Sequence, residues 1–154
     1  METDTTLTGS ELGGVRKRRR RFHAALVELE AALSLAAGRP LEWRAAVAAQ
    51  LDRMRTTLED HIAETEGEGG FFEQIIEDAP RLHARVERLR RDHVALRAAT
   101  EQLQVRFRAQ VPDTDDIDDL RKAVLELLGQ VARHRQNGSD LVYEAYAVDV
   151  AAGD

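Results

Sequence analysis

The chain has 154 residues, enough for one compact domain, and 43% of them are hydrophobic while only 5% are aromatic. It contains no cysteine, which excludes disulfides, thiolate metal sites, iron–sulfur clusters and cysteine nucleophiles, so that any metal must be held by His, Asp or Glu. The net charge of −6 argues against a general nucleic-acid-binding protein, whose overall charge is usually basic.

The hydropathy pattern offers no membrane segment. No apolar run approaches the roughly 20 residues that span a bilayer, and the N-terminus lacks the pattern of a signal peptide. From these two observations we expect no membrane association and a cytoplasmic location.

The first part of the chain passes from a polar segment to one in which apolar residues recur at regular intervals. Residues 1–14 are mostly polar and aperiodic, which predicts a disordered arm. From Val15 to Ala37, apolar residues recur in steps of three and four, which predicts a first helix. Gly38 suits the C-terminal cap of that helix and Pro40 the first turn of the next.

Three further helical stripes follow, over residues 47–61, 82–107 and 117–134. Two segments leave a helix boundary open. GEGG at 67–70 either ends the second helix or kinks it, and QNGSD at 136–140 either ends the fourth helix or bends it.

The stripes together predict the fold class. Their alternating steps of three and four are typical of the seam between antiparallel helices, and the loops between them are mostly short. We therefore expect an all-α, up-down-up-down antiparallel four-helix bundle over residues 15–148, followed by a C-terminal tail at 149–154.

Three histidines occupy inward-facing positions on three different stripes. His61, His93 and His134 stand where Leu or Val would be expected. Burying an imidazole costs free energy unless a partner satisfies it, and one metal ion in a bundle core can satisfy several at once. His23 lies one residue off the first stripe but shares a face with Leu26, so it is a fourth candidate.

The level of these histidines along the bundle axis can be compared crudely. Reflecting the third helix onto the fourth puts His93 opposite about residue 131, close to His134. Reflecting the first helix onto the second puts His23 roughly six residues, or ~9 Å, from the level of His61. A site shared by all four therefore stays open.

The layout resembles the hemerythrin-like (His-His-Glu cation-binding) family, four-helix bundles that hold non-haem iron. The resemblance covers about residues 15–148 and is carried by FHAALVELEAAL, LEDHIAETEG, RLRRDHVALRAA and RHRQNGSDLVYEAY. In that family one His comes from the first helix, His-x-x-x-Glu from the second, one or two His from the third, and His with a nearby carboxylate from the fourth. By position, the resemblance implies the metal ligands His23, His61, His93 and His134.

The second helix departs from the family pattern at its carboxylate. The position four residues after His61 holds Thr65 in place of Glu. Glu64 and Glu66 flank it, and each would need some distortion of the helix to reach inward.

The fourth helix departs in a similar way. The positions four and five residues after His134 hold Gly138 and Ser139, and the nearest acidic residues beyond are Asp140 and Glu144. The bridging carboxylates of a di-iron centre therefore have no direct equivalent here.

Three interpretations stay open. A remodelled iron site would combine the histidines with carboxylates from the set Glu30, Glu64, Glu66, Asp140 and Glu144. A reduced site would hold one Fe, Zn or Mn ion on three or four histidines and one carboxylate. A degenerate bundle would hold no metal and would serve packing or partner binding. Metal binding, with iron as the ion, is our leading prediction, and a metal-free interaction domain is the alternative.

The functional prediction follows from the resemblance. It implies that a bound iron handles or senses a small diatomic ligand such as oxygen or nitric oxide, or peroxide. The sequence shows no Ser/His/Asp arrangement, phosphate loop or nucleotide motif, so any catalysis would belong to the metal. Enzymatic activity is left open.

RKRRRR at 16–21 lies just inside the first predicted helix. Such a run resembles a nucleic-acid patch, but no aromatic residues interleave with it and the whole chain is acidic. We expect a solvated helix start that pairs with acidic residues of a neighbouring helix, of a second copy or of another protein, because cations at a helix N-terminus oppose its dipole.

Overall fold

The computed structural model describes residues 9–35, 38–109 and 117–152. Every element in these ranges is helical, and they contain no strand. The elements are α1 (Gly9–Leu33), α2 (Pro40–Glu66), α3 (Phe71–Asp78), the 3-10 turn η1 (Pro80–Leu82), α4 (His83–Arg108) and α5 (Ile117–Ala152). The prediction of an all-α helical bundle with four long helices is confirmed. None of the described helices combines the length and the apolar character that crossing a membrane would require.

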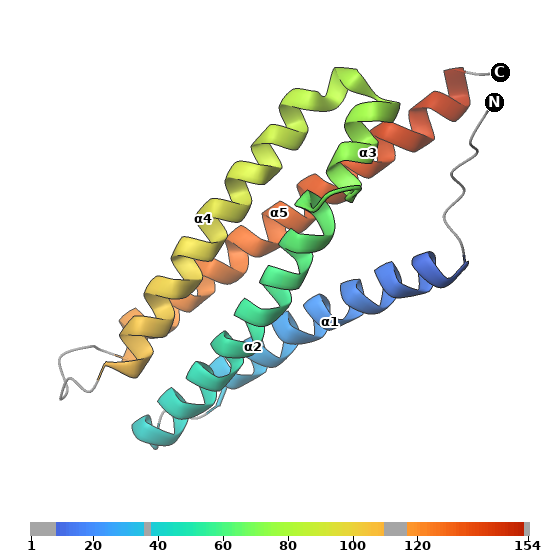
Figure 1. Ribbon diagram of the computed structural model, residues 1–154. Coiled ribbons are helices and arrows are strands. Elements are labelled where there is room, and N and C mark those ends of the chain that lie inside the picture. The colour runs from blue at the N-terminus through green and yellow to red at the C-terminus, as the bar shows by residue number, and fades with distance from the viewer. Residues whose placement is uncertain (1–8, 36–37, 110–116, 153–154) are drawn as a thin grey trace.

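The four long helices pack around a common core. Figure 1 shows the long helices of the bundle, in which α4 packs along both α2 and α5, while α1 packs along α2 and diverges from α5 toward its own N-terminal end. The C-terminal ends of α1 and α4 lie at the same end of the bundle as the N-terminal ends of α2 and α5. The short α3 and η1 cover the opposite end, where α3 contacts α2, α4 and α5.

The core consists of two apolar clusters. The first joins the four long helices and includes Leu29, Leu51, Leu96 and Leu120. The second lies at the α3 end and includes Phe72, Ile75, Leu89 and Leu141. Their members follow the stripes of the sequence, because residues three and four apart lie on one helix face and bury it together.

Histidines occupy the boundary between the two clusters. On α4, His93 lies between Leu89 of the second cluster and Leu96 of the first. On α5, His134 likewise lies between Val131 of the first cluster and Leu141 of the second. The apolar core is therefore interrupted by a polar layer that spans the bundle.

The glycine-rich segment after α2 ends that helix. Gly69 has a φ of 68°, in the left-handed region that glycine adopts without strain, and the Gly70 amide donates a hydrogen bond of 2.8 Å to the Gly67 carbonyl. The tight turn redirects the chain, so residues 71–78 form the separate helix α3. Of the two open alternatives, a helix end is therefore correct here and a kink is not.

Two helix boundaries differ from those expected. Helix α1 begins at Gly9, within the segment expected to be an arm, while residues 1–8 lie outside the described residues. Helix α5 continues without interruption through 136–140 to Ala152, within the expected tail. The polar QNGSD segment stays helical because its neighbours Leu141 and Ala145 are buried against α3 and α4.

Candidate metal centre

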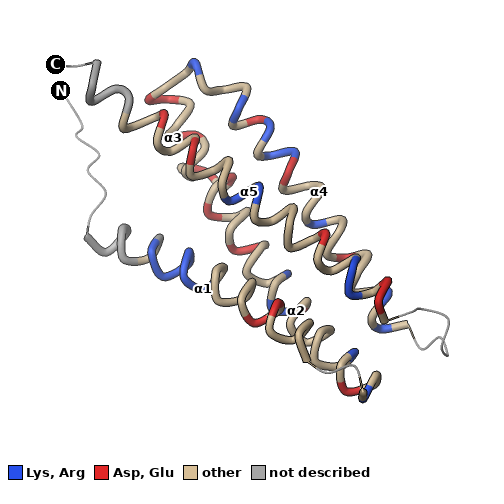
Figure 2. Tube along the Cα trace, turned by 180° about the vertical axis from the view of Figure 1, so that it is seen from behind, with Lys and Arg blue, Asp and Glu red and all other residues tan. Residues whose placement is uncertain are grey.

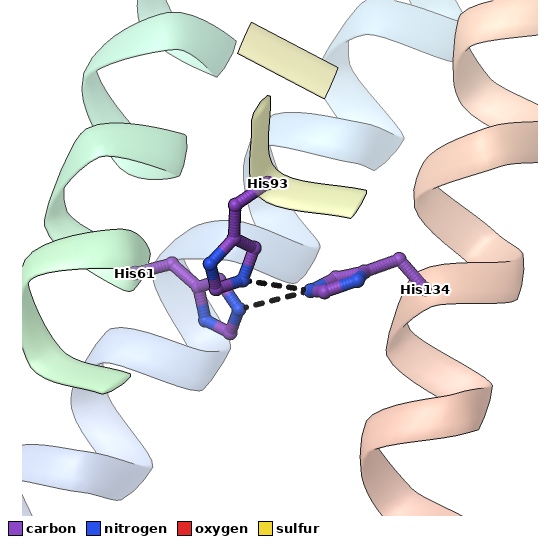
Figure 3. A group of neighbouring side chains, drawn as sticks. All are labelled: His61, His93 and His134. Atoms are coloured by element: carbon purple, nitrogen blue, oxygen red, sulfur yellow. Dashed lines mark hydrogen bonds between the residues drawn. The ribbon is translucent and has the colours of Figure 1, made fainter. Parts of the chain in front are cut away.

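Three long helices each place one histidine at the polar layer. His61 comes from the last turns of α2, His93 from the middle of α4 and His134 from the middle of α5. One ligand nitrogen of each lies within 4.8 Å of those of the others. The Nε2 atom of His134 is 3.0 Å from Nε2 of His93 and 3.3 Å from Nε2 of His61, so the rings converge through their distal nitrogens (Figure 3).

Aromatic rings wall in this group. Phe22 of α1 stacks on His61 with 5.4 Å between ring centroids, and Phe72 of α3 stacks on His93 at 5.6 Å. His93 and His134 are buried, with 1% and 4% of their surface exposed, whereas His61 is partly exposed. The site therefore lies inside the bundle, and the side of His61 is the one nearest to solvent.

Two carboxylates lie behind the buried rings. The Nδ1 atom of His134 is 3.3 Å from Oδ2 of Asp92 and donates a hydrogen bond to it. The Nδ1 atom of His93 is 3.5 Å from Oε1 of Glu66, and it makes no hydrogen bond among the described residues. Carboxylates at the outer nitrogens of metal-binding histidines commonly fix the tautomer and raise the basicity of the inner nitrogen.

The surroundings favour neutral imidazoles. Burial, followed by the neighbouring His134 and by Arg19 and Arg135, lowers the pKa of His61 to about 4. Burial and the two neighbouring histidines lower the pKa of His93 to about 3. The pKa of His134 is also lowered by burial, although Asp92 opposes that shift. At neutral pH all three rings are therefore neutral, and each has one nitrogen with a free lone pair that a metal could use.

The first-helix candidate lies elsewhere. His23 is exposed, and its Nδ1 atom is 3.3 Å from a guanidinium nitrogen of Arg135. The side chain that α1 directs toward the group is the neighbouring Phe22, whose ring lies under His61. The structure therefore brings His61, His93 and His134 together and leaves His23 outside the group.

The second-helix candidates differ from each other. Glu64 forms an ion pair of 2.8 Å with Arg18, away from the histidines. Glu66 reaches His93 from behind, as the last residue of α2. Thr65, at the position of the family Glu, is buried and its hydroxyl donates to the His61 carbonyl at 2.9 Å, so it closes the helix turn.

The two candidates on α5 have other partners. Asp140 is exposed and accepts a hydrogen bond from Gln136 at 2.9 Å. Glu144 forms an ion pair with Arg85 near the start of α4, which lies closer to the α3 end of the bundle than the histidines do. Neither carboxylate faces the three histidines.

Sequence reasoning missed Asp92 and Phe72 at this site, whereas Phe22 already belongs to the first apolar stripe. The only signal for Asp92 is its place directly before a histidine on a seam, and that signal is ambiguous, since Asp60 precedes His61 in the same way and is exposed. Phe72 follows the glycine turn, so its approach to His93 depends on the direction in which α3 leaves α2.

Comparisons with protein-family models, with curated proteins and with solved structures find no match to this chain. Its class is therefore defined by its own features, an all-helical bundle with a cluster of three histidines, of which the two buried ones are each backed by a carboxylate.

Proposed function

We propose that this chain is a metal-binding protein that holds one transition-metal ion, with iron as the first candidate, on Nε2 of His61, His93 and His134. We further propose that the bundle has the up-down-up-down topology of the hemerythrin-like family. The sequence resemblance supports the choice of iron, and the arrangement of the imidazoles supports the choice of ligands.

The observation that carries the proposal is the contact between the Nε2 atoms of His93 and His134. Asp92 requires a proton on Nδ1 of His134, and Glu66 favours one on Nδ1 of His93, because a carboxylate repels a bare lone pair. Both neutral rings then present Nε2 lone pairs to each other at 3.0 Å. With both protons on Nδ1 the contact is repulsive unless a cation lies between or beside the two atoms, whereas a proton on Nε2 of His93 would make the same contact a hydrogen bond.

A proton is a poor candidate for that cation, because burial lowers the pKa of both rings. A metal ion fits better. Two nitrogens that bind one ion at about 2.1 Å, with angles of about 90–110° at the ion, lie about 3.0–3.4 Å apart. Two of the three separations between ligand nitrogens, 3.0 and 3.3 Å, fall in that range, and all three are within 4.8 Å.

The donor set favours one ion over two. A di-iron centre needs bridging carboxylates, whereas Glu64, Asp140 and Glu144 have partners elsewhere and Glu66 faces the back of a ring. Three imidazoles leave coordination positions free, and imidazole is a ligand that suits Fe, Zn, Cu and Ni. A bound iron with a free position would bind oxygen, nitric oxide or peroxide, the ligands that the family resemblance implies.

Metal content tests the proposal directly. Untagged protein from iron-supplemented cells, purified without chelator, is expected to contain about one metal ion per chain by elemental analysis. His93→Ala and His134→Ala should each lose it, while His83→Ala, which changes an exposed histidine outside the group, should retain it. Circular dichroism of each variant separates loss of the ligand from loss of the fold.

Three results would change the proposal. Two irons per chain would show that carboxylates complete a dinuclear site despite their present partners. If each chain contains one zinc ion that iron cannot displace anaerobically, the proposed metal is zinc and not iron. A folded wild-type protein that takes up neither metal would leave the metal-free interaction domain.

A further inference from the structure

Six consecutive cationic residues form a band near the start of α1. The basic band comprises Arg16, Lys17, Arg18, Arg19, Arg20 and Arg21, and every one of them is exposed. Figure 2 shows the band as a continuous blue stretch toward the N-terminal end of α1. At 1.5 Å per residue it concentrates six positive charges into about 9 Å of helix.

The apolar core does not include side chains from this part of α1. Among the described side chains of the helix, the first buried one is Phe22, directly after the band. Toward its N-terminal end α1 also diverges from α5 in both views (Figures 1 and 2). The band therefore lies on a part of α1 whose side chains are outside the apolar core, and it contacts α2 through the Arg18–Glu64 ion pair.

The charges of the band act against the helix that carries them. Cations near a helix N-terminus oppose its dipole, and like charges three and four residues apart repel each other. Arg18 pairs with Glu64 of α2 at 2.8 Å, and it is the one member for which a carboxylate partner is resolved in the described part of the chain. An anionic partner would relieve the repulsion that the bundle leaves in place.

We propose that the basic band binds the phosphate backbone of a duplex nucleic acid. Five of its six members are arginine, whose guanidinium can donate two hydrogen bonds to one phosphate. A duplex carries one negative charge per about 1.7 Å, a density that matches a run of adjacent cations. The proposal is independent of metal binding.

The composition of the band selects this partner over two others. It contains no aromatic side chain on which the bases of a single strand could stack. It also contains no aliphatic or aromatic side chain that could insert into the interface of a lipid bilayer. The net charge of −6 weakens the attraction, but charges beyond about 10 Å are largely screened at 0.1 M salt.

The positions of the band residues around α1 determine which of them should be substituted in a test. Arg16 and Arg20 lie about 200° around the helix from Arg18, on the side away from Glu64, and Lys17 lies between these faces. The variant Arg16→Gln/Lys17→Gln/Arg20→Gln keeps the Arg18 ion pair and uses a good helix former. The control Arg91→Gln/Lys122→Gln/Arg133→Gln removes the same charges from exposed positions on α4 and α5.

The experiment measures binding of full-length protein to a labelled 30-base-pair duplex by fluorescence anisotropy, from about 30 to 200 mM salt. We expect wild-type affinity to fall steeply with salt, with a logarithmic slope of about −4 to −5 for five or so phosphate contacts. The band variant should lose more than tenfold in affinity at the lowest salt and about 2.7 of that slope, because three contacts are removed. The control should bind within about threefold of wild type, and circular dichroism should show all three proteins folded.

Hydrogen exchange locates the contact. Amides of residues 14–21 should exchange more slowly when the duplex is added to wild type, and should be unaffected in the band variant. Three outcomes would overturn the proposal: no wild-type binding at the lowest salt, an equal loss of affinity in the control, or tighter binding to vesicles with about 30% anionic lipid than to the duplex.

Discussion

At the scale of single residues, the histidine cluster depends on which nitrogen of each ring carries the proton. A hydrogen bond to Asp92 sets that choice for His134, and Glu66, 3.5 Å from Nδ1 of His93, favours the same choice there, so in the proposed site both carboxylates would act from behind the ligands. The sequence could identify the histidines, because a polar residue on an apolar stripe stands out. It named Glu66 only as one of several candidate ligands and did not identify Asp92, because both lie on flanks where acidic residues are common.

Asp92→Asn tests this role. An amide can present its oxygen to Nδ1 but carries no charge, so the ring nitrogen at the ion becomes less basic, and we expect metal affinity to fall about 10–100-fold. Competition with a chromophoric chelator measures that affinity. Asp60→Asn is the matched control, because Asp60 also precedes a histidine of the cluster but is exposed. Equal losses in both variants would contradict a specific role for Asp92.

The buried histidines also predict an acid-sensitive fold. The folded-state pKa values of about 4 for His61 and about 3 for His93 lie below the ordinary value of 6.5, so the unfolded chain binds more protons as pH falls. The stabilisation is complete above about pH 6.5 and is lost between that pH and the folded-state pKa values. Each histidine contributes a slope of at most about 1.4 kcal/mol per pH unit to the free energy of unfolding.

Urea unfolding of metal-free protein at pH 7, 6 and 5 measures this slope. We expect His93→Leu to flatten it by about one histidine, and His83→Gln is the matched substitution at an exposed histidine outside the cluster. A slope equal to that of wild type in His93→Leu would show that other groups cause the acid sensitivity.

At the scale of elements, the turn between α2 and α3 positions part of the site. It directs α3 across the end of the bundle, where Phe72 meets the ring of His93. Periodicity predicted the long helices well, because their stripes extend over many turns. It left this turn open because four residues rich in glycine do not reveal whether a helix stops or bends, and α3 has only eight residues.

The stability of the protein should change in opposite directions when Gly70 and when Gly138 is replaced by alanine. A Cβ at Gly70 would meet the Gly67 carbonyl oxygen at 2.6 Å, and backbone cannot move aside cheaply. We expect Gly70→Ala to destabilise the protein by at least 1 kcal/mol, on the order of other local backbone strains. Gly138 lies in α5 with nothing within 4 Å of its Cβ position, so Gly138→Ala should stabilise by up to about 1 kcal/mol. Thermal unfolding of both variants tests the difference, and stabilisation by both would contradict the turn geometry.

At the scale of the whole molecule, the histidine layer separates the two apolar clusters. The level of His93 and His134 could be judged from the sequence, because the loop between their helices is short. His23 lies outside the group because it stands one residue off the first apolar stripe, and Phe22, which is on that stripe, is the residue that faces His61.

Because the histidine layer lies between the two apolar clusters, a bound metal ion is expected to couple the stability of one cluster to that of the other. Binding of iron or zinc should slow amide exchange in α3, whose Phe72 contacts His93, as well as in the helices that bear the ligands. Hydrogen exchange with and without metal measures this effect. Protection confined to α2, α4 and α5 would show that the second cluster opens independently of the site.

The same layer sets a limit on how stable this bundle can become while it keeps its proposed function. Leucines in place of His61, His93 and His134 would join the two clusters into one uninterrupted interior, and interiors of that kind are usually more stable than those with buried polar groups. A search for thermostable variants would therefore favour the loss of these imidazoles. Their presence in the chain shows that stability alone does not explain its sequence at this layer.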